Sequence, residues 1–271
     1  MKIGKALRTE RLNLKLTQEQ MCKGIVSRPF YAKVESGKNR INAESLFEIL
    51  ASHHISFEDF FGLIKDDFLS KDEILQRKME FAVNAKNIKL LEQYGEQILS
   101  STDDKILKMR VIVTVAYFKG NLNSIDLKTK QEVREIFNKK DNWIKNNELL
   151  RLMANTMPLW PQEELNFLIK RLIDEIEKKQ VSKLMLEKYL RILGNYLVTC
   201  FDRKIFNKES NYVNQVISCI IKSTSEFSFM IYRINAIYME ALFNKQFKQT
   251  KQIKEEMKKY GYGDVIAGWP E

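Results

Sequence analysis

The stretch that decides the fold is residues 16–38, which read LTQEQMCKGIVSRPFYAKVESGK. Thr17 begins a capping-box pattern, in which a hydroxyl residue and a Glu or Gln three positions later satisfy the free N–H groups at a helix start. Ser27 is a suitable N-cap for the next helix, and Pro29 falls in its first turn, where a missing N–H costs little. That helix ends near Gly37. The pattern predicts two short helices joined by a tight turn that contains a glycine.

Apolar spacing and helix caps on either side extend this pair to five short helices. The first runs roughly from Ile3 to Asn13, the fourth follows Asn42, and the fifth starts at a second capping box at Ser56. A helix, a tight turn and a helix rich in Arg, Lys and aromatic residues form the helix-turn-helix arrangement. In it the third helix enters the major groove by its N-terminal end, while the N-terminus of the second lies against phosphates.

The distribution of charge favours the same interpretation. The chain has a net charge of +10, and residues 1–40 hold ten Lys or Arg against three Glu. Residues 41–65 hold one Lys against four acids, and the remaining 206 residues carry only +6. Positive charge is therefore concentrated at the front of the chain, where a nucleic-acid contact would use it.

The same stretch resembles a known family of DNA-binding domains. Leu16–Met21, Ser27–Arg28 and Lys33–Lys38 are similar to the helix-turn-helix of Cro/CI-type (XRE) repressors, over about residues 3–62. The turn before the second of these segments is one residue shorter than the usual XRE spacing. That shortening and the all-helical remainder of about 200 residues resemble the Rgg/GadR/MutR regulators, as does Asp141–Leu149, which is similar to the middle region of that family.

The resemblance assigns roles to individual positions. It implies that Gln18 anchors a phosphate or a base edge, that Tyr31 and Val34 face inward, and that Glu35 pairs with Arg11. On the predicted outer face of the third helix, an Arg suits guanine O6 and N7 and a Phe suits a thymine methyl group. The segment 38–40 is either a set of phosphate contacts or a solvated loop. The predicted DNA-binding residues are Thr17, Gln18, Ser27, Arg28, Phe30, Lys33, Lys38, Asn39 and Arg40.

Beyond the first domain the chain continues as helices with short breaks. Residues 1–65 form the predicted DNA-binding domain, 66–71 a linker, and 72–271 a second domain that opens at a third capping box, Ser70–Glu73. Helix pairs at this spacing suggest an all-α, tetratricopeptide-like repeat domain, although the consensus of such repeats is absent. The individually predicted helices are Asp103–Lys119, Asn142–Thr156, Glu163–Lys178, Lys183–Asp202, Tyr212–Ser223, Phe229–Asn244 and Lys248–Tyr260.

Three asparagines in this domain recur at intervals of 40 residues, each in an apolar helix. Two of them follow an arginine by four residues, which places both side chains on one helix face. An Asn can hold the backbone amides of a peptide, and an Arg can hold a carboxylate. The family resemblance implies a ligand of this kind, a short hydrophobic signalling peptide. Alternatively, these residues only bond neighbouring helices. The predicted peptide-binding residues are Arg151, Asn155, Arg191, Asn195, Arg233 and Asn235.

Other functional classes find no support in the sequence. The only two histidines are adjacent, and there is no metal-protease motif, phosphate loop or nucleophile elbow, so we expect neither an enzyme nor a cofactor or metal site. The three cysteines are scattered, as in a reducing cytoplasm. No signal peptide and no membrane span are apparent. The aromatic residues of the second domain are expected in its core, and the tail from Gly261 to Pro270 is expected to be non-helical.

These observations predict a cytoplasmic, homodimeric, sequence-specific transcription regulator controlled by a short hydrophobic peptide, of quorum-sensing type. The family resemblance assigns the dimer contacts to the C-terminal helices. Two alternatives remain open: an XRE-type repressor controlled by a metabolite or a protein partner, and a helical-repeat interaction scaffold. The concentration of positive charge in residues 1–40 argues against a scaffold whose first domain is passive.

Overall fold

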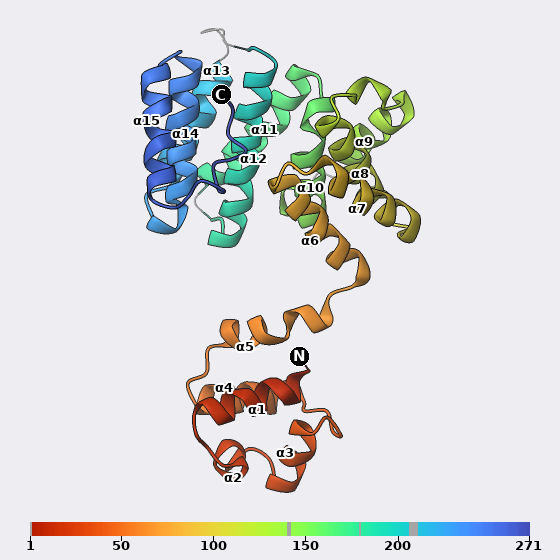
Figure 1. Cartoon of the computed structure of the whole chain (residues 1–271), viewed down its shortest axis with the longest axis vertical. Coiled ribbons are helices and arrows are strands. Elements are labelled where there is room, and N and C mark those ends of the chain that lie inside the picture. Colours follow the sequence, from red (N-terminus) through yellow and green to blue (C-terminus); the bar gives the residue numbers. More distant parts are fainter. Residues whose placement is uncertain (1, 140–141, 179, 206–210) are drawn as a thin grey trace. The chain divides into compact units, whose positions relative to one another are not determined.

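The computed structural model describes residues 2–139, 142–178, 180–205 and 211–271, and every regular element in these ranges is helical (Figure 1). The all-α class predicted from the sequence is therefore confirmed. The chain divides into two compact units, Met1–Ile74 and Leu75–Glu271. No helix of the described ranges is both long and apolar enough to cross a membrane.

The first unit contains the five predicted helices, followed by a short 3-10 turn. The capping box at Thr17 is present, since its hydroxyl accepts from the backbone N–H of Gln20 and its own N–H donates to the side chain of Gln20. Ser27 occupies the N-cap of the next helix but makes no side-chain capping bond. The elements are α1 (Ile3–Asn13), α2 (Gln18–Cys22), α3 (Arg28–Glu35), α4 (Ala43–Ser52), α5 (Phe57–Ile64) and η1 (Lys65–Phe68).

The core of this unit brings apolar side chains from all five helices together. Tyr31 and Val34 are among its buried residues, as predicted for the inner face of α3. Gly4 lets α1 approach α3 closely, because a Cβ atom added there would lie 1.9 Å from the carbonyl oxygen of Val34. The N-terminal end of α1 is thus packed directly against the C-terminal end of α3. The remaining core residues are Ala6, Leu7, Met21, Cys22, Leu46, Ile49, Leu50, Phe60 and Ile64.

The boundary between the units falls within α6, whose start at Ser70 has the predicted capping box. The predicted helices are present, with α7 and α9 in addition to those predicted individually. Asp141, the first residue of the family-like segment, lies outside the described residues, and the expected helix start at Asn142 is instead a 3-10 turn. The elements are α6 (Lys71–Asn84), α7 (Ile88–Ser101), α8 (Lys105–Phe118), η2 (Leu122–Ser124), α9 (Leu127–Lys139), η3 (Trp143–Lys145), α10 (Asn147–Thr156), η4 (Met157–Leu159), α11 (Gln162–Glu177), α12 (Lys183–Asp202), α13 (Asn211–Ser223), η5 (Phe227–Phe229), α14 (Met230–Phe243) and α15 (Phe247–Lys259).

Four of these helices, α8, α10, α12 and α14, lie side by side in that order and are called the central row below (Figure 1). Helices α11, α13 and α15 pack against the row from outside. The space between the layers is filled by the largest apolar cluster of the molecule, which includes Trp143, Trp160, Tyr189, Tyr196 and Tyr238. The prediction that these aromatic residues form core is confirmed. Tyr232 is only half-buried and packs at the edge of the cluster.

The C-terminal tail is non-helical from Gly261 onward, as predicted. It folds back on the end of the helical array, where the Trp269 ring packs on Tyr238 with their centroids 5.0 Å apart. The hydroxyl of Tyr238 donates to the carbonyl oxygen of Pro270, and Ile266 of the tail is buried. The tail therefore covers apolar surface that α14 would otherwise expose.

Candidate DNA-binding site and ligand-binding surface

The helix-turn-helix is held together by one buried ion pair. Arg11 of α1 binds Glu35 of α3 through two hydrogen bonds, Nε to Oε1 at 2.6 Å and Nη2 to Oε2 at 3.1 Å. Its third bond, from Nη1 to the carbonyl oxygen of Leu16, fixes the segment that leads into α2. The side chains of Arg11 and Glu35 are only 12% and 4% exposed. The pair predicted from the sequence is thus confirmed, and it connects three consecutive elements.

Gln18 of α2 belongs to the same network. Its Nε2 group donates to Oε2 of Glu35 at 2.9 Å, so this donor is engaged inside the protein rather than directed at a phosphate. Burial alone would raise the pKa of the Glu35 carboxyl, but the hydrogen bonds from Arg11 and Gln18 outweigh it, and the pKa lies below its ordinary value. Glu35 is therefore ionised at neutral pH and fixes the relative placement of α2 and α3.

The outer surface of α3 and the segment after it carry the positive charge. Arg28 and Lys33 are exposed on α3, and Lys38 and Arg40 are exposed just beyond its end. The loop is ordered by backbone bonds, because the N–H groups of Lys38 and Asn39 both donate to the carbonyl oxygen of Lys33. Exposed guanidinium and ammonium groups on one short helix and its following loop match the requirements of a groove and phosphate contact.

The other predicted contacts are less accessible. Phe30 is only half-exposed and packs against the core of the unit, so only part of its ring remains for a thymine methyl group. Thr17 and Ser27 are exposed at the starts of α2 and α3, while Asn39 is half-buried in the loop. Four cations and two hydroxyls therefore form the accessible part of the predicted DNA-binding set.

In the second unit, polar side chains gather on the central row around a buried arginine. Arg110 of α8 is 7% exposed and donates to Oδ1 of Asn155 at 3.1 Å, to Oε2 of Glu148 at 3.3 Å and to Oε1 of Gln76 at 3.1 Å. Arg151 shares the same carboxylate at 3.4 Å. Burial lowers the pKa of Arg110 more than Glu148 raises it, yet an Arg remains cationic at neutral pH. Asn155 and Arg151, both predicted ligand residues, are thus brought together by a residue that the prediction missed.

Farther along the row, α12 and α14 repeat this combination of charges and amides. Glu187 of α12 accepts from Arg191 at 3.2 Å and from the hydroxyl of Tyr232 of α14 at 3.1 Å. Asn195, one turn beyond Arg191, is exposed. Its neighbour Gly194 lies against α14, because a Cβ atom there would be 3.4 Å from Oδ1 of Asn235. Asn235 of α14 therefore lies against α12 beside Gly194, which is next in sequence to Asn195.

The predicted ligand residue Arg233 bonds to an outer helix. The guanidinium of Arg233 donates to the carbonyl oxygen of Ile221 in α13 at 2.8 Å, so it caps the end of an outer helix. The sequence spacing of Arg233 also differs from that of the other two arginines, since Arg233 precedes Asn235 by two positions rather than four. The Arg233 guanidinium thus binds α13, whereas Arg151 and Arg191 each pair with a glutamate of their own helix.

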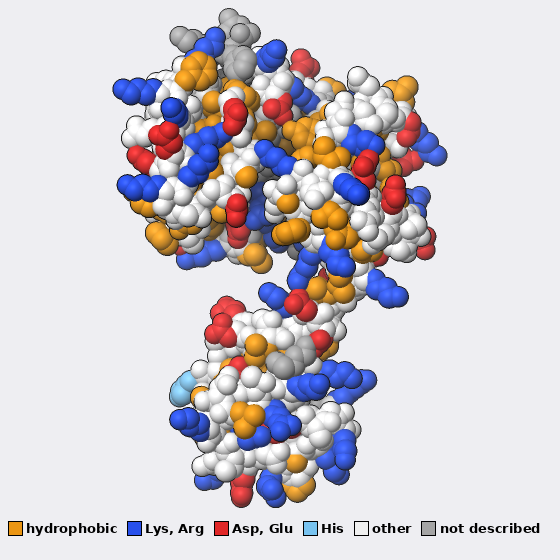
Figure 2. Space-filling model, in the orientation of Figure 1, with side chains coloured by type: hydrophobic (Ala, Val, Ile, Leu, Met, Phe, Trp, Pro, Cys, Tyr) orange, Lys and Arg blue, Asp and Glu red, His pale blue; other side chains and the backbone are white. Residues whose placement is uncertain are grey.

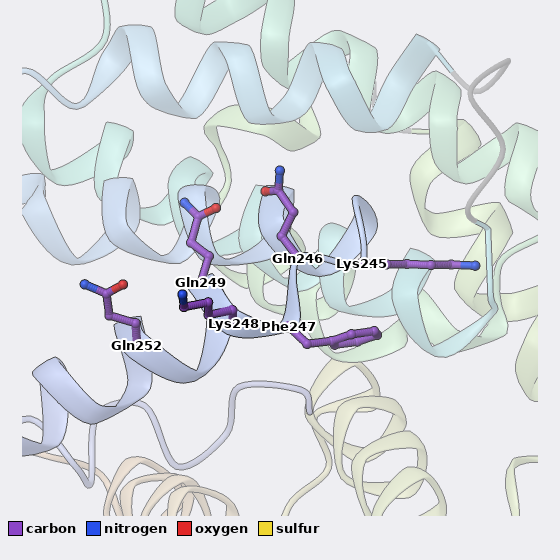
Figure 3. Close-up of a pocket in the computed structure, with 6 residues that line it drawn as sticks. All are labelled: Lys245, Gln246, Phe247, Lys248, Gln249 and Gln252. Atoms are coloured by element: carbon purple, nitrogen blue, oxygen red, sulfur yellow. The ribbon is translucent and has the colours of Figure 1, made fainter.

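A hollow at the start of α15 is separate from the central row. Its side chains spread in different directions instead of converging on a common point (Figure 3). A ligand there would meet few polar groups at once, so we do not assign it a function. The residues that line it are Lys245, Gln246, Phe247, Lys248, Gln249 and Gln252.

Comparison with known proteins agrees with the two-part architecture. Residues 7–60 match a family model described as helix-turn-helix. A candidate transcriptional regulator from Listeria monocytogenes EGD-e superposes with a TM-score of 0.73 at 19% identity, covering 98% of this chain and 93% of that one. The SHP pheromone receptor Rgg2 of Streptococcus dysgalactiae gives 0.66 at 12% identity, covering 98% and 96%. A bacterial peptide pheromone–receptor complex gives 0.62 at 15% identity, covering 97% and 94%. Among curated proteins, no sequence match was found.

These similarities establish the fold. Residues 7–60 form a helix-turn-helix, and over 97–98% of its length the chain has the fold of the three similar structures. This confirms the fold that the Rgg resemblance predicted. The matched family model is described as a helix-turn-helix, and the Listeria structure is described as a transcriptional regulator.

Proposed function

We propose that this protein is a cytoplasmic, homodimeric transcription regulator that binds DNA through α3 and is controlled by a short hydrophobic peptide bound on the central row. The DNA-binding part of this proposal is supported by the exposed cations of α3 and its following loop, and the Arg11–Glu35 pair holds α3 in position. A single domain this small makes few contacts, so two copies would bind half-sites about one helical turn, roughly 34–36 Å, apart. The C-terminal helices are the proposed dimer contact.

The polar surface of the central row supports the peptide part. A peptide in extended conformation presents a repeating series of backbone amides, which Asn side chains can both donate to and accept from. Arg151 and Arg191 would hold carboxylates, since both are exposed and each pairs with a partly accessible glutamate of its own helix. A structure similar to this one contains a peptide pheromone with its receptor, and this similarity is the reason for proposing a peptide ligand.

Control would arise through differential binding. A peptide that binds one arrangement of the helical unit better than another shifts the population towards that arrangement, and the shift is limited by the difference in affinity. A coupling of about 1–3 kcal/mol would change DNA affinity by roughly 5–150-fold.

Asn195 offers the cleanest test of the peptide site, because it is exposed and its side chain makes no hydrogen bond in the described part of the chain. Asn155 is less suitable, since replacing it also removes a partner of Arg110. The experiment measures DNA binding of the purified protein with short hydrophobic peptides encoded beside its gene. Asn195→Ala should weaken the peptide response and leave the helix content unchanged.

Asn214→Ala is the matched control, because Asn214 is exposed on the outer helix α13. It should respond to peptide as the wild type does. If Asn195→Ala and Asn214→Ala respond equally, the peptide does not use this surface. If no peptide alters DNA binding of the wild type, control by a metabolite or protein partner replaces the proposed control.

A further inference from the structure

Half of the positive charge in the first forty residues is not explained by α3 and its loop. Arg28, Lys33, Lys38 and Arg40 belong to the predicted DNA-binding set, and Arg11 is neutralised by Glu35. Of the five remaining cations, three lie at the start of the chain. These are Lys2, Lys5 and Arg8, and all three are exposed.

The three residues form one stripe on α1. Lys5 and Arg8 are three positions apart, so their side chains share one side of α1, away from the buried Ala6 and Leu7, and Lys2 is the N-cap directly before the helix. None of the three is paired with an acidic side chain within the described ranges. The stripe therefore presents three unpaired positive charges to the solvent.

The packing of α1 sets the position of this stripe. Gly4, between Lys2 and Lys5, lies against the last turn of α3, where Val34 and Glu35 are. The loop that carries Lys38 and Arg40 starts at the same end of α3. In Figure 2, blue side chains gather along the edge of this unit where the start of α1 and the loop after α3 lie. The stripe and the predicted DNA-binding loop are therefore parts of one positively charged edge.

On α1 the one acidic residue is Glu10, which is half-buried, and most exposed acidic residues of the unit lie on other helices. Glu44 and Glu48 are exposed on α4, and Glu58 and Asp59 are exposed on α5. Solubility alone would be served by interspersed charges, whereas a separation of the two signs gives one surface that attracts the DNA backbone and another that it repels. This separation favours a polyanion as the partner of the α1 stripe.

We propose that Lys2, Lys5 and Arg8 form a second DNA-contacting surface that binds the phosphate backbone beside the groove occupied by α3. The inference rests on the proposed DNA-binding function and extends it to the start of α1, which the predicted DNA-binding set does not include. Contacts to phosphate carry no sequence information but fix the orientation of the domain on the duplex. Each neutralised phosphate also releases condensed counterions, which makes the contact measurable as a salt dependence.

The test is a salt titration with a short DNA duplex of random sequence, which needs no knowledge of the operator. Full-length wild type, the double variant Lys5→Gln with Arg8→Gln, and Lys65→Gln are compared by fluorescence anisotropy between about 50 and 200 mM salt. All three substituted side chains are exposed, so the variants should fold as the wild type does. Lys65 is the C-cap of α5, is not one of the three proposed contacts, and provides a single charge change of the same type for comparison.

We expect the slope of log affinity against log salt to become shallower by about 0.9 per lost contact, so by roughly 2 in the double variant. Lys65→Gln should keep the wild-type slope. The inference is overturned if the double variant keeps the wild-type slope. It is also overturned if Lys65→Gln changes the slope by the same amount per removed charge as the double variant does. A wild type that shows no salt-dependent binding refutes the DNA-binding function itself, which is a separate outcome.

Discussion

Replacement of Arg11 by Met leaves the buried Glu35 carboxylate with Gln18 as its main partner. The two bonds of 2.6 and 3.1 Å from the guanidinium disappear, while the carboxylate stays 4% exposed. Breaking a buried ion pair from one side costs about 3–5 kcal/mol, because the remaining charge is uncompensated. Since small domains have total stabilities of about 5–15 kcal/mol, the first unit should become marginally stable.

The sign of the pH dependence provides a sharper test than the magnitude. In the wild type the pKa of Glu35 lies below its ordinary value of about 4.3, so its contribution to stability is present above that value and is lost as the pH falls through the folded pKa. Without Arg11, burial becomes the dominant effect and raises the pKa of Glu35. The variant should then gain stability as the pH falls from 7 towards 5, while the wild type does not.

Hydrogen exchange of residues 3–64, expressed as protection factors, reports on this unit separately from the helical-repeat unit. The double variant Arg11→Met with Glu35→Met is the control. It should recover most of the lost protection, since a buried ion pair replaced by apolar side chains of similar size is often neutral. The account of the ion pair would be refuted if Arg11→Met lost less than about 1 kcal/mol of stability, or if its stability changed with pH in parallel with that of the wild type.

Two further predictions follow from packing and burial. Gly4→Ala should destabilise the first unit by about 1–3 kcal/mol or more, because its Cβ atom would lie 1.9 Å from the carbonyl oxygen of Val34. Chemical denaturation, monitored by hydrogen exchange, measures the loss of stability. An unchanged stability would contradict the close approach of α1 to α3. The three thiols are buried, and burial raises the pKa of Cys219 to about 11. The native protein should therefore react with Ellman's reagent far more slowly than the unfolded chain, in which all three thiols react. Fast reaction of a thiol in the native protein would contradict this burial.

Most of the first unit could be predicted from the sequence because its signals are local. The capping pattern at Thr17, the glycine at 37 and the alternation of inward and outward positions on α3 depend on residues within one or two turns of each other. The bond from Gln18 to Glu35 could not be predicted in this way, since it depends on how α2 crosses α3. The same holds for Phe30, whose partial burial results from tertiary packing.

In the second unit the sequence identified helices but not how their polar groups pair. Asn155 attracted attention by its regular spacing, whereas Arg110, which binds it, lies in the otherwise apolar run from Met109 to Val113. A lone charge in such a run is the signal that could have identified it, because a buried Arg requires partners. The orientation of Arg233 towards α13 depends on the angle between two helices, which spacing along one helix does not determine.

The most direct test of DNA recognition is the binding of the full-length protein to the DNA upstream of its own gene, compared with a scrambled duplex across a salt series. The double variant Arg28→Ala with Lys33→Ala is measured alongside, because both side chains are exposed on α3. The account predicts that the wild type prefers its own upstream DNA, and that the variant loses this preference and has a shallower salt slope. Equal binding of wild type and variant to both duplexes would contradict the assignment of α3 to the DNA groove.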